Sequence, residues 1–165
     1  RPGDDLHALA TPQAAPAGEM RIRLCDTEQE VSGISVELVI TAEPFAESVP
    51  YSLTLHAGGS PVAHVAEAEL TPAELFALGH ALLDAAADGF GHFVPADEVF
   101  GLDLAPPSVP RAIEEVGLAV WVDAGRAQAE TPTRSGVAVQ LVVDAPALAG
   151  VAEAVCDQAA RVLNA

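Results

Sequence analysis

The chain has 165 residues, of which half are hydrophobic and only 4% are aromatic. This length suits a single domain, or two small halves that share a core, and the core should be packed from small aliphatic side chains. The formal net charge is −17, and all seven basic residues are arginine. Such a charge argues against binding to nucleic acid through its phosphates and against anionic membrane surfaces.

Residues 1–19 form a polar arm rich in proline and alanine, ahead of a single α+β domain that we expect over residues 20–165. Such a composition should not fold alone, so we expect the arm to dock on its own domain or on a partner. The arm lacks the pattern of a signal peptide, and no stretch of the chain approaches the ~18 apolar residues of a membrane span. We therefore expect a cytoplasmic protein.

The two cysteines, Cys25 and Cys156, lie outside any metal-ligand spacing. We expect two buried thiols, which are typical of a reducing cytoplasm. A disulfide that joins the first strand of the domain to its last helix is the alternative.

The first half of the domain predicts antiparallel strands. Residues 20–25 and 34–41 are the first two, and in the second of them apolar and polar side chains alternate along the chain. Residues 51–57 and 60–70 predict a hairpin that turns at the two glycines between them.

The register of this hairpin decides which side chains face the core. A two-residue turn sets Leu55 opposite Val62 and Leu53 opposite His64. In that register His64 points inward and Val65 points outward.

A helix is predicted directly after the hairpin, over residues 72–88. Thr71 is the expected N-cap, and Glu74 completes a capping box. Gly89 marks the C-terminal stop. The apolar stripe at helical spacing consists of Leu75, Leu78, Leu82 and Ala86.

A second strand–strand–helix unit follows, with strands over 117–124 and 136–145 and a helix over 146–163. The apolar positions of the two helices match in order. This match indicates an internal duplication with units at about 50–89 and 117–164, although chance similarity between two Leu/Val/Ala helices is the alternative.

These elements predict an α+β fold with two layers. One mostly antiparallel sheet of about six strands would carry the helices on one face. A loop over 89–107 and a short helix over 108–117 would connect the two units.

A pocket between the sheet, the helix over 72–88 and the loop over 89–107 is one candidate site. Its polar residues would be His64, His92, Asp97 and Glu98. Loops of this length often act as lids or binding loops. The alternatives are a buried histidine that serves only the core and a linker whose phenylalanines plug the ends of the core.

A metal site would need His80 and Asp84, which share one face of the predicted helix, together with His92 from the loop. That face lies off the apolar stripe and should be solvated. No paired-histidine spacing supports a metal, so we expect neither a metal nor another cofactor.

A protein interface is the other candidate site. Alternation places Trp121, the only tryptophan, on the side of its strand opposite to the apolar core positions. The candidate interface on this outer sheet face comprises Trp121, Val142, Val39 and Val65. Coverage of the same face by the N-terminal arm is the alternative.

The chain contains no nucleophile elbow, phosphate-binding glycine loop or Cys/His pair, so the sequence favours a protein that is not an enzyme. We expect a small acidic binding or regulatory protein that acts through protein contacts with a partner or with a second copy as a homodimer. A small-molecule-binding domain or enzyme that uses the pocket described above is the alternative. An acidic inhibitor that mimics nucleic acid is less favoured, because the carboxylates alternate with alanine instead of clustering.

Overall fold

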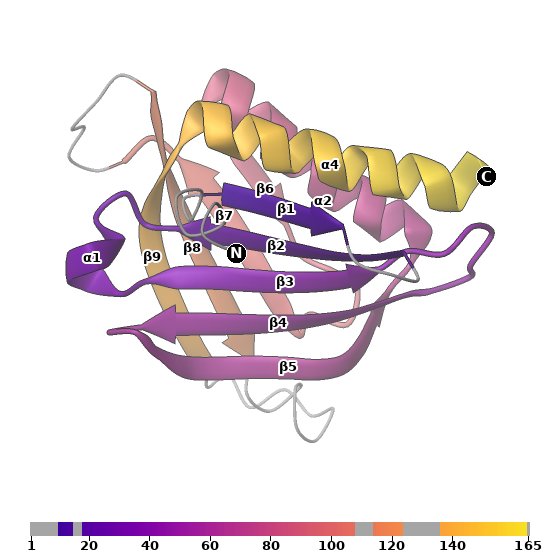
Figure 1. The fold of residues 1–165 in the computed structure, drawn as a ribbon, viewed down its shortest axis with the longest axis horizontal. Coiled ribbons are helices and arrows are strands. Elements are labelled where there is room, and N and C mark those ends of the chain that lie inside the picture. Colours follow the sequence, from indigo (N-terminus) through magenta and orange to yellow (C-terminus); the bar gives the residue numbers. More distant parts are fainter. Residues whose placement is uncertain (1–9, 15–17, 108–113, 124–135, 165) are drawn as a thin grey trace.

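A computed structural model describes residues 10–14, 18–107, 114–123 and 136–164 of the chain (Figure 1). Its fold is α+β with two antiparallel sheets. The strands of the first, sheet A, are β1 (Ala10–Ala14), β2 (Glu19–Cys25), β3 (Ser35–Thr41), β4 (Val49–Ala57) and β5 (Ser60–Leu70). The strands of the second, sheet B, are β6 (Gly91–Phe93), β7 (Phe100–Ala105), β8 (Glu115–Asp123) and β9 (Gly136–Asp144). The described helices are α1 (Gln29–Ser32), α2 (Pro72–Asp88) and α4 (Ala145–Asn164).

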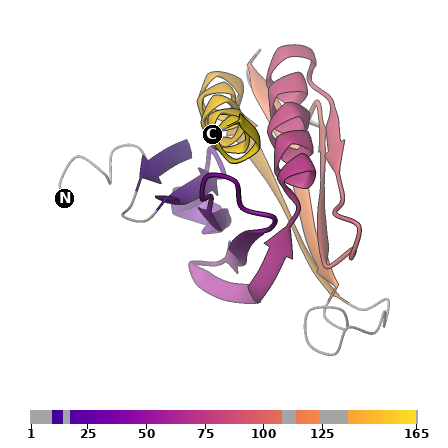
Figure 2. The same ribbon diagram turned by 90° about the vertical axis from the view of Figure 1, so that its right-hand side faces the viewer.

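The two sheets form a wedge that is closed on one side and filled by helices on the other. On the closed side, β4 contacts β9 and β5 contacts β8. On the open side, α2 and α4 pack side by side, with α4 next to β1 and α2 next to β6 (Figure 2). The core therefore lies between three surfaces, namely the inner faces of both sheets and the helix pair.

Helix α2 has the ends that the sequence predicts. The Thr71 side chain accepts a hydrogen bond from the Glu74 backbone N–H, and the Glu74 carboxylate accepts one from the Thr71 backbone N–H. Gly89 closes the helix in the left-handed conformation. The buried stripe contains Leu75, Leu78 and Leu82, as expected.

The helix pair depends on small side chains at its crossing. A Cβ atom on Gly79 would lie 2.7 Å from the Cys156 sulfur and 3.1 Å from its backbone nitrogen. The hydrogen side chain of Gly79 therefore allows the two helix backbones to approach closely. Leu148, Val151 and Val155 of α4 are completely buried in the same core.

The prediction of a single sheet of about six strands is wrong, because the strands form two sheets. The predicted loop over 89–107 contains β6 and β7, which pair with each other and begin sheet B. Their apolar residues close the core, because the Phe100 ring packs against those of Tyr51 in sheet A and Phe93 in β6. Phe93 and Phe100 thus close the core as the linker alternative expects, but the segment is not a linker and Phe90 is exposed.

The β6–β7 connection is attached to α2. The second oxygen of the Glu74 carboxylate accepts a hydrogen bond of 2.7 Å from the Ala96 backbone N–H. One side chain thus holds both the start of a helix and a turn of sheet B.

The predicted hairpin is present, but its register is wrong. Gly58 and Gly59 form the turn with positive φ angles, as two-residue hairpin turns require. Beyond the turn, irregularities in the β4–β5 ladder shift the pairing by one residue, so Leu55 lies opposite Ala63 and Leu53 opposite Val65. A shift of one residue exchanges the two faces of a strand. Val65 is therefore buried, whereas His64 is exposed.

The remaining predictions have mixed outcomes. Residues 10–14 of the expected arm pair with β2, which places this segment on its own domain. The predicted helix over 108–117 falls mostly outside the described residues, and Glu115–Gly117 belong to β8. Each sheet ends in two strands followed by a helix, but the internal duplication is not confirmed.

Candidate functional site

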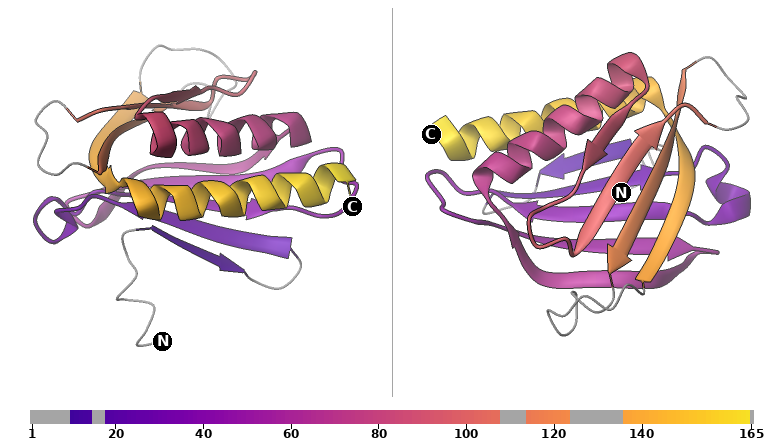
Figure 3. Two further views of the ribbon diagram at one scale, coloured as in Figure 1. Left: turned by 90° about the horizontal axis from the view of Figure 1, so that it is seen from above. Right: turned by 180° about the vertical axis from the view of Figure 1, so that it is seen from behind.

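The candidate site lies on the outer face of sheet B, which is turned away from the helices and from sheet A (Figure 3, right). One cross-strand row on this face consists of His92, Asp103, Ala119 and Gln140. The next row in one direction consists of Gly101, Trp121 and Ala138. The next in the other direction consists of Ala105, Gly117 and Val142.

A hollow of about 560 Å³ opens on this face. Its floor is formed by Gly117 and Ala119 of β8, and Gln140 and Val142 of β9 lie along one side. Such a volume falls within the range of small-molecule sites. The full lining is Asp26, Asp103, Ala105, Pro106, Pro107, Gly117, Leu118, Ala119, Gln140, Leu141 and Val142.

The opposite wall of the hollow is made by Pro106 and Pro107, which leave β7 and turn over β8. A Cβ atom on Gly117 would lie 3.0 Å from the Ala105 carbonyl oxygen and 3.4 Å from the Pro107 Cα. Such a contact is tighter than side chains normally tolerate. Gly117 therefore allows the wall to approach the floor.

A histidine–carboxylate pair lies beside the hollow. His92 Nδ1 is 2.5 Å from the Asp103 Oδ1 atom, and both side chains are largely exposed. A carboxylate can only accept, so the Nδ1 atom carries the proton in this contact. The hydrogen bond orients Asp103 and uses one of its oxygens.

The second carboxylate of the lining, Asp26, has a structural role. Its Oδ1 atom accepts a hydrogen bond from the Val142 backbone N–H, and its Oδ2 atom accepts one from the Ser32 hydroxyl. The Thr27 backbone N–H donates to the Val142 carbonyl oxygen. These bonds attach the end of β2 to the edge of sheet B, so Asp26 contributes charge to the hollow while it holds the two sheets together.

The Trp121 side chain lies against Gly101 of the neighbouring strand. A Cβ atom on Gly101 would lie 2.3 Å and 2.5 Å from two carbons of the indole. Trp121 is half-buried through this contact, within its own sheet. Part of the ring is therefore covered by the neighbouring strand.

The structure brings together some predicted site residues and separates others. Trp121 and Val142 share the outer face of sheet B, as expected, and His92 reaches the same face from β6. Val39 belongs to sheet A, and Val65 is buried in the core with 2% exposure. The predicted four-residue outer surface is therefore not one surface.

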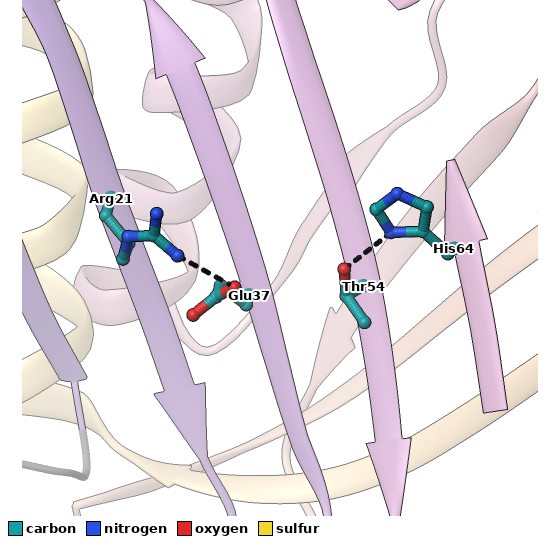
Figure 4. Close-up of polar contacts among 4 residues, drawn as sticks. All are labelled: Arg21, Glu37, Thr54 and His64. Carbon is teal, nitrogen blue, oxygen red and sulfur yellow. Dashed lines mark hydrogen bonds and ion pairs between the residues drawn. The ribbon is translucent and has the colours of Figure 1, made fainter. Parts of the chain in front are cut away.

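The predicted pocket between sheet and helix does not form around its four residues. His64 lies on the outer face of sheet A, where its Nδ1 atom is hydrogen-bonded to the Thr54 hydroxyl at 2.7 Å (Figure 4). His92 lies on sheet B, and Asp97 and Glu98 lie in the exposed β6–β7 connection. The neighbours of His64 on sheet A include the ion pair of Arg21 with Glu37.

Sequence reasoning missed several lining residues of the hollow, including Gln140, Pro106 and Pro107. The alternation in β7, with Phe100, Leu102 and Leu104 buried, was a usable signal, because it places Asp103 outward. No pattern in the sequence could have indicated Pro106 and Pro107, because their position depends on the way the chain turns over β8.

The histidines, acidic residues and cysteines elsewhere in the described chain give weaker evidence for a site. Among the described residues, no group of three or more histidine, cysteine, aspartate or glutamate side chains is placed to hold a metal. His80 is exposed, and its ring packs on that of Phe76 on α2 at 4.3 Å. Both cysteines are free, and burial raises the pKa of each thiol.

Comparison of the chain with protein-family models, curated proteins and solved structures gives no significant match. Within the part of the chain that the structure describes, no helix has the length and apolar character that a membrane span requires.

Proposed function

We propose that the protein is a non-enzymatic binding protein that contacts a protein partner through the outer face of sheet B. The observation that carries this proposal is the hollow next to Trp121, on a face that no described element covers. An aromatic side chain beside a recess is a common centre of protein interfaces. With two free thiols, we place the protein in a reducing cytoplasm.

The chemistry of the hollow favours binding over catalysis. Its described lining contains no serine, threonine, cysteine, lysine or tyrosine. Within this described lining, no nucleophile is present that the pair of His92 and Asp103 would activate. The pair is also largely exposed, whereas catalytic acids and bases are usually tuned by burial.

A second copy of the chain is the less favoured partner. Each copy carries a formal net charge of −17, and this charge opposes close approach of two equal surfaces. A homodimer through this face would tighten as salt screens the repulsion, whereas binding to a positively charged partner would weaken with salt.

A small-molecule ligand is the second candidate. The volume of the hollow favours it, since about 300–1,000 Å³ is usual for such sites. Against it, much of the lining is an open sheet face with small side chains.

The test compares proteins captured from extracts of the native cell by the wild type, by Trp121→Asp and by Phe76→Asp. Phe76 is an exposed aromatic residue on α2 and provides the matched control. The proposal predicts that at least one captured protein is lost with Trp121→Asp and kept with Phe76→Asp. Identical capture by all three, with no change in sedimentation of the purified protein across salt concentrations, would contradict the proposal.

A further inference from the structure

Sheet B is an acidic surface, and the only basic group on its four strands is the His92 imidazole, which is paired with Asp103. Its four strands contain Asp103, Glu115, Asp123 and Asp144 but no arginine or lysine. Asp103 lines the hollow directly, and Asp26 adds a second carboxylate to the lining. The hollow therefore offers acceptors and negative charge, and its lining contains no cationic side chain.

Acceptor capacity on this face is not fully used. His92 bonds to one oxygen of Asp103, and Asp103 contributes to the lining of the hollow.

We propose that the hollow receives an arginine side chain of a basic protein partner, held by the Asp103 carboxylate. This inference rests on the proposed function and specifies the partner. The charge of the chain, −17, favours a partner of opposite charge by attraction at long range.

Arginine fits the shape of the site better than lysine. Gly117 and Ala119 contribute no side chain larger than a methyl group to the lining. A planar guanidinium can lie against such small residues while its fork of donors meets a carboxylate. The apolar stem of the side chain would lie along Pro106, Pro107 and Val142. The row places Gln140 two strands away from Asp103, where its amide oxygen can accept a further donor.

The chain carries its own reporter for this test. Trp121 is the only tryptophan, and it lies two residues from Ala119 on the same face of β8. Intrinsic fluorescence would therefore follow titration of the protein with the capped peptide Gly-Arg-Gly. Matched peptides carry citrulline, which has the shape of arginine without its charge, or lysine.

We expect saturable binding of the arginine peptide, and binding weaker by about tenfold or more for the citrulline peptide. The lysine peptide should fall between them. Asp103→Asn should weaken binding of the arginine peptide by about tenfold. Asp84→Asn, which removes an exposed carboxylate on α2, should leave binding unchanged. Amide chemical shifts should move at Ala119 and Gln140 and stay constant at Leu78.

Three outcomes would overturn the inference: no saturable binding of the arginine peptide, equal affinity for the citrulline or lysine peptide, or unchanged affinity in Asp103→Asn. Far-ultraviolet circular dichroism of Asp103→Asn checks that the variant is folded. If the peptide test fails while Trp121→Asp still loses a captured protein that Phe76→Asp keeps, the proposed function stands and the arginine inference falls.

Discussion

The indole of Trp121 on β8 lies against Gly101, its cross-strand partner on β7. A glycine opposite an aromatic residue in a sheet leaves room for the ring to cover the neighbouring strand. This relationship explains why a large ring is stable on an outer sheet face without an obligatory partner. It also keeps the ring in a defined position beside the hollow.

Gly101→Ala should displace the indole, because the new Cβ would lie 2.3 Å from a ring carbon. We expect a loss of about 1–3 kcal/mol in the free energy of unfolding, as for other overpacked sites, and a red shift of the Trp121 emission. Gly150→Ala on α4, where nothing lies within 4 Å, is the control and should stabilise by about 0.5–1 kcal/mol. An unchanged emission spectrum in Gly101→Ala would show that the ring does not rest on this glycine.

Leu78→Ala should destabilise the protein by about 2–5 kcal/mol, since Leu78 is buried between α2 and the core. Leu163→Ala on α4, at a half-exposed position, should change stability by less than about 0.5 kcal/mol. Urea denaturation measures both. If the denaturation midpoint of Leu78→Ala equals that of the wild type, α2 does not pack Leu78 into the core as the structure has it.

Glu74→Ala should be more destabilising than Thr71→Ala. Loss of the Thr71 cap should cost about 1 kcal/mol. Loss of Glu74 removes its bond to the Thr71 backbone and also its bond to the Ala96 backbone, so we expect about 1–3 kcal/mol. Thermal denaturation of the two variants decides the comparison. Equal effects would mean that the contact with Ala96 contributes nothing.

Tyr51 should make the protein sensitive to alkali. Burial, with smaller contributions from Asp97 and Glu74, raises the pKa of Tyr51 well above its usual value of 10.0. The unfolded state therefore loses this proton first, and stability should fall as the pH rises above that value. Tyr51 is the only tyrosine, so an absorbance titration reports on it alone.

Tyr51→Phe is the matching variant. At neutral pH it should be neutral or stabilising by up to about 1 kcal/mol, because the buried hydroxyl has no hydrogen-bond partner among the described residues. Above pH 10.0 the variant should lose less stability than the wild type. A wild-type tyrosine that titrates at its usual pKa would contradict the burial of the ring.

The two thiols should react slowly in the native state. Burial raises the pKa of Cys25, partly offset by Arg23, and burial with Asp157 and Glu153 raises that of Cys156. Since the thiolate is the reactive form, a thiol-specific reagent should modify Cys156 slowly and Cys25 only after unfolding. Denatured protein should titrate as two thiols. If no thiol reacts after denaturation without a reductant, the disulfide alternative is correct.

Local signals in the sequence were sufficient for part of the fold. The capping box of Thr71 and Glu74, the leucine stripe and the Gly58–Gly59 turn depend on residues close together in the chain, and each is confirmed. The orientation of Trp121 follows from alternation within one strand and needs no other strand.

The features that the sequence did not reveal depend on distant residues. Alternation predicts which residues share a face only until a bulge intervenes, and Glu67, with φ of 56°, adopts a left-handed conformation within β5. Irregular pairing before that point had already exchanged His64 and Val65. Strand β6 has three residues, too few for a pattern, so the division into two sheets was not visible. The hollow combines Asp26, Pro107 and Gln140 from three separate parts of the chain.

The placement of α4 in the open side of the wedge has a consequence for synthesis on the ribosome. Sheet A and α2 are complete before residues 145–164 are made, yet the apolar surface that α4 covers is then still uncovered. Leu148, Val151 and Val155 have no exposure in the finished protein. The apolar side chains of α2 that pack against α4 therefore stay exposed until α4 is made. The nascent chain would therefore expose this apolar surface for the time that residues 89–164 take to be added, at about 5–20 residues per second. During that interval a chaperone that recognises exposed aliphatic side chains would have its best opportunity to bind.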